Sequence, residues 1–415
     1  MDTKDAMVIV GAGQCGARAA QALRRHGWGG PIVLLGEEQD APYERPPLSK
    51  QVLMGQKTTQ QCALFDESFF QEQRVSLQLG TKVKSIDRLR RQVATADGRA
   101  FQYHRLLIAT GAQPRRLDIP GATLSGVHVL RDTSDAQAIA AALTPGRRIA
   151  VIGAGFIGME VAASAIAQGC DVVVLEAGAR PLMRAVPEAV ASCLAQKHLQ
   201  KGVDLRCGVR IERIVGSEQV TGVLLGDGTA VSCDAVIVGI GVTPRVALAQ
   251  ASGLEIENGI AVGETLRTSD PDIFSAGDVC SFIHPLFDRR MRLESWKNAE
   301  DQADLAARNM LGANQTYTAV PWFWSDQYEL TIQIAGMPIF GAQTVVREIS
   351  TDSRIFFAID EHGVVIGASG VGHVGEIARD MRIGQELIAR RARVEPHRLA
   401  DRAVKLKSLL ATEHA

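Results

Sequence analysis

Residues 7–16 read MVIVGAGQCG, and residues 149–158 read IAVIGAGFIG. In both stretches a short apolar run enters a Gly-x-Gly-x-x-Gly loop, a helical stretch follows, and a second apolar run ends near an acidic residue, Glu37 or Glu176. The loop glycines are Gly11, Gly13 and Gly16 in the first copy and Gly153, Gly155 and Gly158 in the second. Such glycines allow a tight turn and let the N–H groups of a helix start approach a pyrophosphate, while the acid accepts hydrogen bonds from a ribose. The sequence therefore predicts two dinucleotide-binding βαβ units.

A second internal repeat supports the duplication of a whole domain. The segments DGRAFQYHRLLIATGAQPR and DGTAVSCDAVIVGIGVTPR each open on an Asp-Gly hairpin signal, cross an apolar strand and reach a glycine 14 positions on, Gly111 and Gly241. Farther along, the stretch TSDPDIFSAGDVC contains a short apolar strand that ends at Gly277 and Asp278. This carboxylate can face a second phosphate or a sugar-like chain, although Gly-Asp is also a common turn.

The composition excludes several function classes. The 415 residues carry a formal net charge of -1, which argues against bulk electrostatic binding to nucleic acid or membrane. We see no secretory signal and no apolar run of roughly 18 residues, so we expect a cytoplasmic protein without a membrane span. The seven cysteines are scattered without a Cys-x-x-Cys pair or metal-ligand spacing, so neither a disulfide framework nor a metal site is expected. Cys15 lies inside the first glycine loop, and we interpret it as a small filler.

The loop PYERPPLSK, Pro42–Lys50, is stiffened by three prolines and carries Glu44, Arg45 and Lys50. Charges on a rigid backbone favour a binding role. The alternative is the capped start of a helix near Leu48, with its charges in solvent.

Taken together, these motifs resemble the FAD-dependent pyridine nucleotide reductases with two dinucleotide-binding domains. LIATGA at 107–112 and the IFSAGD segment match the family's second and third flavin signatures. PYERPPLSK, RLESWKNAEDQA at 292–303 and PWFWSDQY at 321–328 look like the ferredoxin reductases of bacterial oxygenase systems. That group includes the reductases of Rieske aromatic-ring dioxygenases and putidaredoxin reductase. The resemblance covers nearly the whole chain.

The resemblance implies an α/β fold like that of glutathione reductase, with two Rossmann-like dinucleotide-binding domains and a C-terminal α+β domain. It places an FAD-binding domain at 1–112 and 243–318, an NAD-binding domain at 113–242 and the C-terminal domain at 319–415. It implies FAD and NADH as cofactors, and electron transfer from NADH through FAD to a [2Fe–2S] ferredoxin of the Rieske type. That ferredoxin would feed an oxygenase of aromatic-compound catabolism. A monomer or weak homodimer is expected.

The resemblance also implies roles for individual residues. Lys50 and Glu160 are the catalytic candidates: Glu160 is expected in the first turn of a helix near the nicotinamide, where it can pair with Lys50, whose charge favours reduced flavin. The alternatives are a helix-terminus carboxylate for Glu160 and an ordinary helix-entry charge for Arg131. The cofactor-binding candidates are Gly11, Gly13, Cys15, Gly16, Glu37, Arg45, Lys50, Val83, Ala109, Thr110, Gly111, Arg131, Gly277, Asp278, Glu294, Trp296, Gly153, Gly155, Ile157, Gly158, Glu160, Glu176, Arg184, Gly241, Trp322 and Trp324.

Two rival classes stay open. One is another enzyme on the same scaffold, such as a rubredoxin reductase, an NADH oxidase or a monodehydroascorbate-type reductase. The loop Pro42–Lys50 contains no redox cysteine, which argues against the oxidase and disulfide-reducing branches. The other is an NADH-sensing interaction protein of the apoptosis-inducing-factor kind.

Residues 379–407 form a basic segment near the C-terminus. They contain nine Arg or Lys and four Asp or Glu, a net charge of +5. Such a face can steer an acidic ferredoxin, and the alternative is a solvated helical face.

Overall fold

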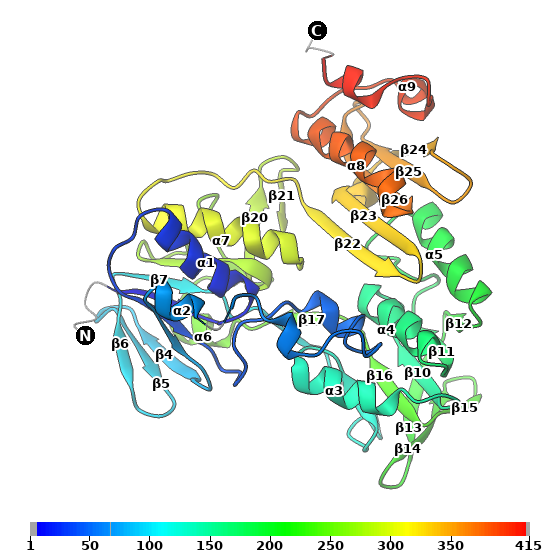
Figure 1. Ribbon diagram of the computed structural model, residues 1–415, viewed down its shortest axis with the longest axis horizontal. Helices are drawn as coiled ribbons and strands as arrows, with labels where there is room; N and C mark the ends of the chain where they lie inside the picture. The colour runs from blue at the N-terminus through cyan, green and yellow to red at the C-terminus, as the bar shows by residue number, and fades with distance from the viewer. Residues whose placement is uncertain (1–5, 67, 412–415) are drawn as a thin grey trace. The chain divides into compact units, whose positions relative to one another are not determined.

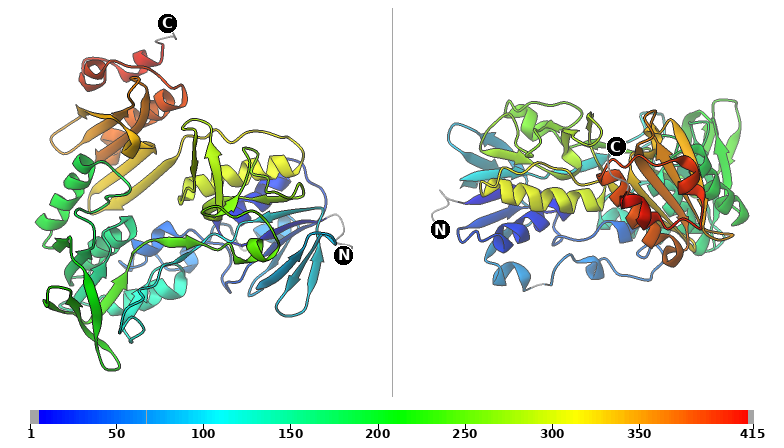
Figure 2. Two further views of the ribbon diagram at one scale, coloured as in Figure 1. Left: turned by 180° about the vertical axis from the view of Figure 1, so that it is seen from behind. Right: turned by 90° about the horizontal axis from the view of Figure 1, so that it is seen from above.

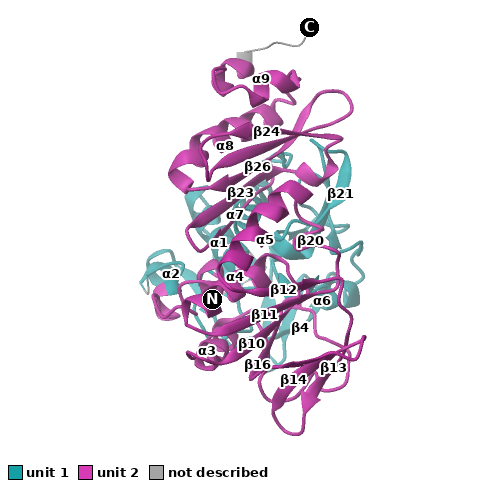
Figure 3. Cartoon of the chain, turned by 90° about the vertical axis from the view of Figure 1, so that its right-hand side faces the viewer, with its two compact units in different colours: residues 1–44, 62–113, 243–319 teal, residues 45–61, 114–242, 320–415 magenta. Residues whose placement is uncertain are grey.

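The computed structural model describes residues 6–66 and 68–411. The chain folds into two compact units (Figure 3). The first unit comprises 1–44, 62–113 and 243–319, and the second comprises 45–61, 114–242 and 320–415. The units group 45–61 and the C-terminal segment with the expected NAD-binding domain, and the three-domain division stays a prediction.

The first unit is built around a five-stranded parallel sheet in the order β19-β7-β1-β2-β3. Its strands are β1 (Met7–Val10), β2 (Ile32–Leu35), β3 (Val75–Gln78), β7 (Arg105–Ile108) and β19 (Ile273–Ser275). Strands β1 and β2 are buried along their whole length, as expected for a parallel sheet covered on both faces. Val10 is in register with Leu35 and with Ile108, so three strands end at one edge, where the first glycine loop begins.

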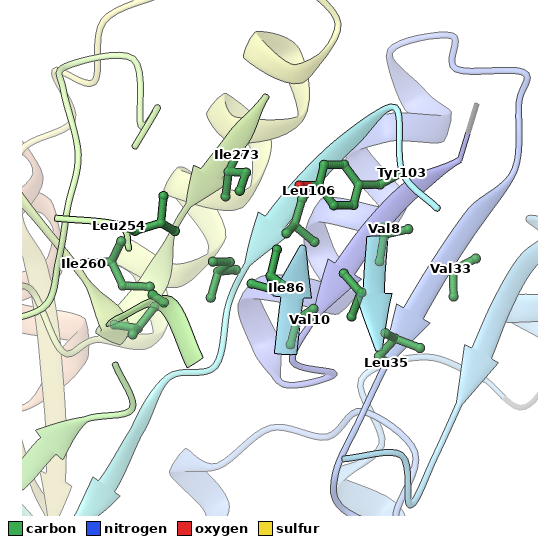
Figure 4. Close-up of a cluster of buried hydrophobic side chains, with 14 of the residues drawn as sticks. Val8, Val10, Val33, Leu35, Ile86, Tyr103, Leu106, Leu254, Ile260 and Ile273 are labelled. Atoms are coloured by element: carbon green, nitrogen blue, oxygen red, sulfur yellow. The ribbon is translucent and has the colours of Figure 1, made fainter. Parts of the chain in front are cut away.

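Helices and a buried cluster complete this core. Helix α1 (Gln14–Arg25) connects β1 to β2 and packs against α7 (Trp296–Met310) (Figure 1). Burial of apolar surface between the parallel sheet and the neighbouring ribbon holds the unit together. The cluster includes Val8, Val10, Val33, Leu35, Ile86, Tyr103, Leu106, Leu254, Ile260 and Ile273 (Figure 4).

The remaining elements of the first unit are short. An antiparallel ribbon of β4 (Val83–Asp87), β5 (Gln92–Thr95) and β6 (Ala100–Gln102) is drawn in cyan in Figure 2. The expected turn at Asp97 and Gly98 joins β5 to β6. The others are α2 (Phe69–Glu72), α6 (Ala247–Ala251), η3 (Gly277–Val279), β18 (Ile260–Ala261), β20 (Cys280–His284) and β21 (Arg289–Met291). Where the chain passes between units lie η2 (Gln60–Cys62), β8 (Ala112–Pro114) and β17 (Val242–Pro244).

The second unit repeats the same plan. A parallel sheet runs β12-β11-β10-β16-β9, and β10 pairs with β11 and β16 as β1 pairs with β2 and β7. The strands are β9 (Val127–Val129), β10 (Arg148–Ile152), β11 (Asp171–Glu176), β12 (Asp204–Cys207) and β16 (Ala235–Val238). The helices are α3 (Thr133–Ala142), α4 (Phe156–Ala167) and α5 (Glu188–Gln200). An antiparallel ribbon of β13 (Ile211–Gly216), β14 (Val220–Leu225) and β15 (Ala230–Ser232) completes it. The predicted duplication is thus confirmed in the fold.

The C-terminal part of the second unit is an antiparallel sheet in the order β22-β23-β26-β25-β24, with helix α8 against β23 and β26. The strands are β22 (Trp322–Gln327), β23 (Leu330–Gly336), β24 (Gln343–Glu348), β25 (Arg354–Ile359) and β26 (Val365–Gly372). The helices are α8 (Val374–Ala389), α9 (Pro396–Ala400), η4 (Pro338–Phe340) and η5 (Leu406–Ala411). The proline-rich loop Pro42–Lys50 contains η1 (Pro46–Ser49), a 3₁₀ turn that stands in place of the helix expected near Leu48. Strand β22 is an edge strand, and it packs on α4.

The two glycines around the start of α4 have different structural duties. A Cβ added at Gly158 would lie 2.0 Å from the carbonyl oxygen of Gly153, whereas at Gly155 the nearest atom would be 3.9 Å away. We expect Gly158→Ala to lower Tm on the order of 5–10 °C, because contact with rigid backbone forces the helix off its strand. The matched variant Gly155→Ala should leave Tm within about 2 °C. Thermal unfolding followed by circular dichroism measures both, and equal losses would show that packing does not distinguish the two glycines.

Candidate functional site

The first glycine loop forms a cradle at the start of α1. Gly13 is the N-cap and contributes no side-chain cap, so the N–H groups of the first turn face the loop opening. A Cβ added at Gly13 would meet nothing within 4 Å, whereas one at Gly16 would lie 1.8 Å from the carbonyl oxygen of Gly11. Both polar atoms of the Gln14 side chain are buried and have no hydrogen-bond partner among the described residues. Uncapped N–H groups, open space at Gly13 and unsatisfied polar atoms fit a bound diphosphate.

Glu37 lies two residues beyond β2 in an electropositive setting. Its carboxylate pairs with Lys82 at 3.0 Å and with Arg245 at 2.8 Å. Burial alone would raise the pKa of Glu37, but the bonds to the two cations outweigh burial and lower it. The carboxylate is therefore an anionic acceptor, as a ribose contact requires. Val83, the first residue of β4, follows Lys82 directly and packs against the core cluster.

The LIATGA segment crosses the end of β1. The N–H of Ala109 donates to the carbonyl of Val10 at 2.8 Å, which continues the sheet beyond β7. Thr110 Oγ1 donates to the carbonyl of Arg245 at 2.9 Å, and the N–H of Arg245 donates to Gly111 at 2.9 Å. The segment is thus tied both to β1 and to the residue that holds Glu37.

A second group of candidates gathers around η3 in the same unit. Gly277 adopts φ +79°, and its N–H donates to Gln302 at 2.7 Å. Arg292 donates to the backbone carbonyl of Asp278 at 3.3 Å and pairs with Glu294. Trp296 follows as the first residue of α7, where Ser295 is the N-cap. Arg292, which the sequence did not single out, therefore joins Asp278 to Glu294, while Gln302 holds Gly277.

Cys15 has the environment of a structural residue. Its Sγ would lie 3.3 Å from a Cβ at Gly277, so there is little free space around it. Burial raises the pKa of the Cys15 thiol well above its usual value, and the nearby Cys280 and Asp278 add to this rise. A neutral, enclosed thiol is a poor nucleophile, in agreement with a filler role.

The second glycine loop repeats the cradle at the start of α4. Gly155 is an N-cap without a side-chain bond. Glu176, the last residue of β11, accepts hydrogen bonds from the N–H of Ala154 and the N–H of Gly178, both at 2.6 Å. Ile157 in the first helical turn is 48% exposed, which is unusual for a large apolar side chain beside a polar loop. Gly241 lies close to Arg184, whose guanidinium is 3.9 Å from the position of an added Cβ.

A buried ion pair joins η1 to α4 in the second unit. Lys50 Nζ lies 3.2 Å from Glu160 Oε1, and the two residues are 7% and 3% exposed. Ser49 Oγ donates to Glu160 Oε2 at 2.5 Å, and Ser325 Oγ donates to Oε1 at 2.6 Å. Ser164 Oγ donates to the backbone carbonyl of Ser49 at 2.8 Å and so holds η1 against α4. The carboxylate thus receives three donors, which a buried charge needs.

One expectation about this pair was wrong in detail. Glu160 is the fifth residue of α4, because the helix begins at Phe156, and it therefore lies beyond the first turn. The same position argues against the alternative that Glu160 is a carboxylate stabilised by the dipole at the helix N-terminus, because that effect falls off beyond the first turn.

The W-x-W pair lies beside the ion pair. The Trp322 and Trp324 rings stack at 5.3 Å with an interplanar angle of 25°, and Lys50 Nζ lies 5.7 Å from the Trp324 ring centre. Trp324 Nε1 donates to Asp326 at 3.1 Å. Because side chains alternate along β22, the two tryptophans share one face of the strand, and Ser325 lies on the other.

Arg45 and Arg131 also meet in the second unit. The Arg45 guanidinium donates to the backbone carbonyl of Arg131, and the N–H of Arg131 donates to Asp135 at 2.8 Å. Arg45, Lys50 and Arg131 were expected to contact the same cofactor as the first glycine loop, which belongs to the other unit. Their shared cofactor contact stays a prediction.

Sequence reasoning missed several side chains of these sites. They are Gln14, Lys82, Arg245 and Arg292 in the first unit and Ser49, Ser325, Gln327 and His198 in the second. Ser49 and Ser325 lie inside the loop and W-x-W motifs, so those motifs were a signal. Arg245 ends the quoted repeat segment DGTAVSCDAVIVGIGVTPR, so that repeat was a signal as well. Lys82 and His198 carry no local signal, because only long-range folding brings them to their partners.

Within 6–66 and 68–411, no group of three or more His, Cys, Asp or Glu side chains is arranged to hold a metal ion. No helix in the described part of the chain is long and apolar enough to cross a membrane.

Known proteins resemble the chain along its length. The family described as pyridine nucleotide-disulphide oxidoreductase matches residues 5–303, and the family described as reductase C-terminal matches 322–410. The ferredoxin–NAD(+) reductase component of the anthranilate 1,2-dioxygenase system of Burkholderia cepacia is 40% identical, covering 98% of this chain and 99% of the relative. Putidaredoxin reductase of Pseudomonas putida is 37% identical over 100% and 99% of the two chains. The solved covalent putidaredoxin reductase–putidaredoxin complex matches with a TM-score of 0.94 and 36% identity, covering 99% of both chains.

These similarities span both glycine-loop units and the C-terminal sheet. The chain therefore belongs to the pyridine nucleotide-disulphide oxidoreductase family, among its ferredoxin reductases.

Proposed function

We propose that this protein is an FAD-dependent NADH:ferredoxin oxidoreductase that supplies electrons to an oxygenase of aromatic-compound catabolism. One observation carries the proposal: the chain aligns along 98% to 100% of its length with reductases whose names include a ferredoxin or putidaredoxin. All seven cysteines are free thiols, and the loop Pro42–Lys50 contains no redox cysteine, which argues against the disulfide chemistry of the wider family.

Each of the two glycine loops binds one cofactor in this proposal. FAD binds the first loop, where Gly13 leaves space, Gln14 offers unsatisfied polar atoms and Glu37 is an ionised ribose acceptor. NADH binds the second loop, where Glu176 closes β11 beside the start of α4. Bound flavin supplies the ability to accept a hydride and to release electrons singly.

Lys50 and Glu160 hold opposite charges in a dry environment beside Trp324. Fixed charges in such an environment act with little screening. In the proposal, the Lys50 ammonium stabilises negative charge that develops on the flavin ring, and Glu160 keeps Lys50 in place.

A ferredoxin is the electron acceptor, and we take it to be of the Rieske type that serves a ring-hydroxylating oxygenase. The anthranilate dioxygenase component among the relatives favours this choice. Because each unit buries its own core, the proposal needs no second copy, and a monomer or weak homodimer suffices. Free thiols and the use of NADH favour a cytoplasmic location.

The basic segment 379–407 is the proposed steering surface for this ferredoxin. Arg379 and Arg382 lie on the exposed side of α8, and Arg390 is exposed at its C-cap. Asp380 faces inward instead and pairs with the buried Arg347 at 3.3 Å, so its charge does not offset the outer cations.

NADH should be preferred over NADPH, because the Glu176 carboxylate repels a 2′-phosphate at the ribose it faces. Glu176→Ala should reduce the ratio of the two kcat/KM values by about tenfold, as expected for the loss of one partly screened charge contact. Glu188→Ala is the matched control, since Glu188 is an exposed acid at the start of α5. Steady-state rates with both donors measure the ratio. A ratio unchanged by Glu176→Ala would remove this residue as the discriminator.

Lys50→Met should slow flavin reduction at saturating NADH by roughly tenfold or more, while FAD stays bound, because the ammonium acts on developing charge. Stopped-flow absorbance measures the rate, and bound flavin per chain measures retention. The single variant leaves Glu160 buried without its cation, so Lys50→Met/Glu160→Gln is needed to separate stability from rate. The double variant should regain stability and stay slow. Loss of FAD with a normal rate after reconstitution would assign Lys50 a structural role.

Ferredoxin reduction should fall as salt rises, whereas NADH-dependent ferricyanide reduction should change little, because steering of a protein partner is screened over roughly 8 Å at physiological salt. The double reversal Arg379→Glu/Arg382→Glu should lower kcat/KM for ferredoxin on the order of tenfold at low salt. The control Arg210→Glu/Arg213→Glu makes the same charge change at exposed positions in and before β13. If both pairs have equal effects, or neither has any, α8 is a solvated face and docking occurs elsewhere.

A further inference from the structure

A chain of hydrogen bonds runs through the second unit from Glu160 to Tyr328. Ser325 Oγ lies 2.6 Å from Glu160 Oε1 and 3.0 Å from Gln327 Nε2. Gln327 Oε1 lies 2.7 Å from His198 Nε2, and His198 Nδ1 lies 3.0 Å from the Tyr328 hydroxyl. The chain therefore connects helix α4 to strand β22 and then to helix α5.

The donors and acceptors in this chain follow from its two ends. An ionised carboxylate only accepts, so Ser325 donates to Glu160. The serine oxygen then accepts from the Gln327 amide nitrogen, and the amide oxygen, which cannot donate, faces His198. His198 must therefore carry its proton on Nε2, which leaves Nδ1 to accept from the Tyr328 hydroxyl. Every hydrogen bond points towards the carboxylate.

The middle of the chain is dry and uncharged. His198, Gln327 and Ser325 are 0%, 2% and 0% exposed. Burial lowers the pKa of His198, and the bond to Gln327 offsets only part of this effect. The charged groups beside it are Lys197 on α5, Lys201 at the end of that helix and Glu329 at the tip of the β22–β23 hairpin, and both lysines pair with Glu329. The links between the hairpin tip and Glu160 are therefore neutral dipoles.

The far end of the chain is held by a strained turn. Tyr328 adopts φ +57°, a conformation that is uncommon for an aromatic residue, and its ring contacts the His198 ring edge-on at 5.0 Å. Lys197 on α5 and Lys201 at its C-cap both pair with Glu329, the next residue of the hairpin. This clamp fixes the hairpin on α5 and holds the Tyr328 hydroxyl against the imidazole.

The chain is suited to orienting a charge and not to moving a proton. Transfer through Gln327 would require a neutral amide to accept a proton on oxygen while losing one from nitrogen. Aligned hydrogen bonds in a dry interior instead polarise one another and favour one direction. Without the Gln327 N–H, the Ser325 hydroxyl has no bond that directs its proton towards Glu160.

We propose that His198 and Gln327 are positioning residues for Glu160: acting through Ser325, they fix the carboxylate that holds the Lys50 ammonium in place. The inference rests on the proposed function, because it assigns the Lys50–Glu160 pair to flavin reduction. It adds that helix α5 of the nucleotide-binding sheet and the hairpin of the C-terminal sheet jointly set the geometry of that pair.

The kinetic test compares two substitutions at one position. His198→Leu removes the Nε2–H donor and should lower the rate of flavin reduction at saturating NADH on the order of tenfold, with the Kd for NADH unchanged. His198→Gln places an amide N–H near the same acceptor and should return the rate to within about threefold of the wild-type protein. Lys197→Met is the matched control, because it weakens the clamp without touching the chain. If His198→Leu and Lys197→Met slow reduction equally, the hairpin contact matters and the hydrogen-bonded chain does not.

A spectroscopic test on the purified, FAD-loaded protein does not depend on turnover. Long-range ¹H–¹⁵N spectra, with the His198 signals assigned by their loss in His198→Leu, should show a neutral ring protonated on Nε2. In Gln327→Met this proton should lose its protection from solvent exchange. A neutral ring with its proton on Nδ1, or a doubly protonated ring at neutral pH, would change the order of hydrogen-bond donors and acceptors at His198 and overturn the proposal. If NADH fails to reduce the flavin of the wild-type protein, the proposed function fails. The tautomer of His198 still decides whether the hydrogen-bonded chain from Tyr328 to Glu160 exists.

Discussion

The ion pair of Lys50 and Glu160 is the constraint on which the second unit depends. Two charges removed from water are stable only when their remaining hydrogen-bonding capacity is met nearby. The donors to Glu160 come from η1 and from β22, segments that lie far from α4 in the sequence. The pair therefore ties the prolyl loop and the edge strand of the C-terminal sheet to one helix. Loss of Lys50 or Glu160 would leave the other charge buried without its ionic partner, and loss of either serine would remove one of the three donors to the carboxylate.

Strand β22 meets this constraint because its two faces carry different chemistry. One face presents Trp322 and Trp324, which stack on each other near Lys50. The other presents Ser325 and Gln327, together with Phe323, which contacts Phe156 of α4 at 4.5 Å. A shift of one residue in the pairing with β23 would exchange the faces and remove the Ser325 donor from Glu160. The register of one antiparallel pair thus affects the environment of the carboxylate that holds Lys50 in place.

Sequence patterns predicted the parts of the structure that depend on local chemistry. The glycine loops, the two parallel sheets, the Asp-Gly hairpins and the acid that ends β11 follow from short motifs with steric or turn requirements. Glu160 was expected in the first turn of α4 but lies beyond it, because the helix begins at Phe156, directly after the N-cap Gly155. The partners of Glu37 and the His198 chain were also missed. Lys82 and His198 show no periodicity or motif, and only the tertiary fold gives each of them a partner. Arg245 ends a repeat segment, but the repeat does not indicate its pairing with Glu37.

Neutral dipoles have an advantage over a second ion pair for holding Glu160. A further buried cation would add its own desolvation cost and would compete with Lys50 for the carboxylate. Ser325, Gln327 and His198 instead supply aligned partial charges, and each is satisfied by the next. Such a chain transmits position without changing net charge, so Lys50 remains the cation nearest to the carboxylate oxygen that Ser325 shares. The conformation of the β22–β23 hairpin tip thereby affects the Lys50–Glu160 pair only through the direction of these hydrogen bonds.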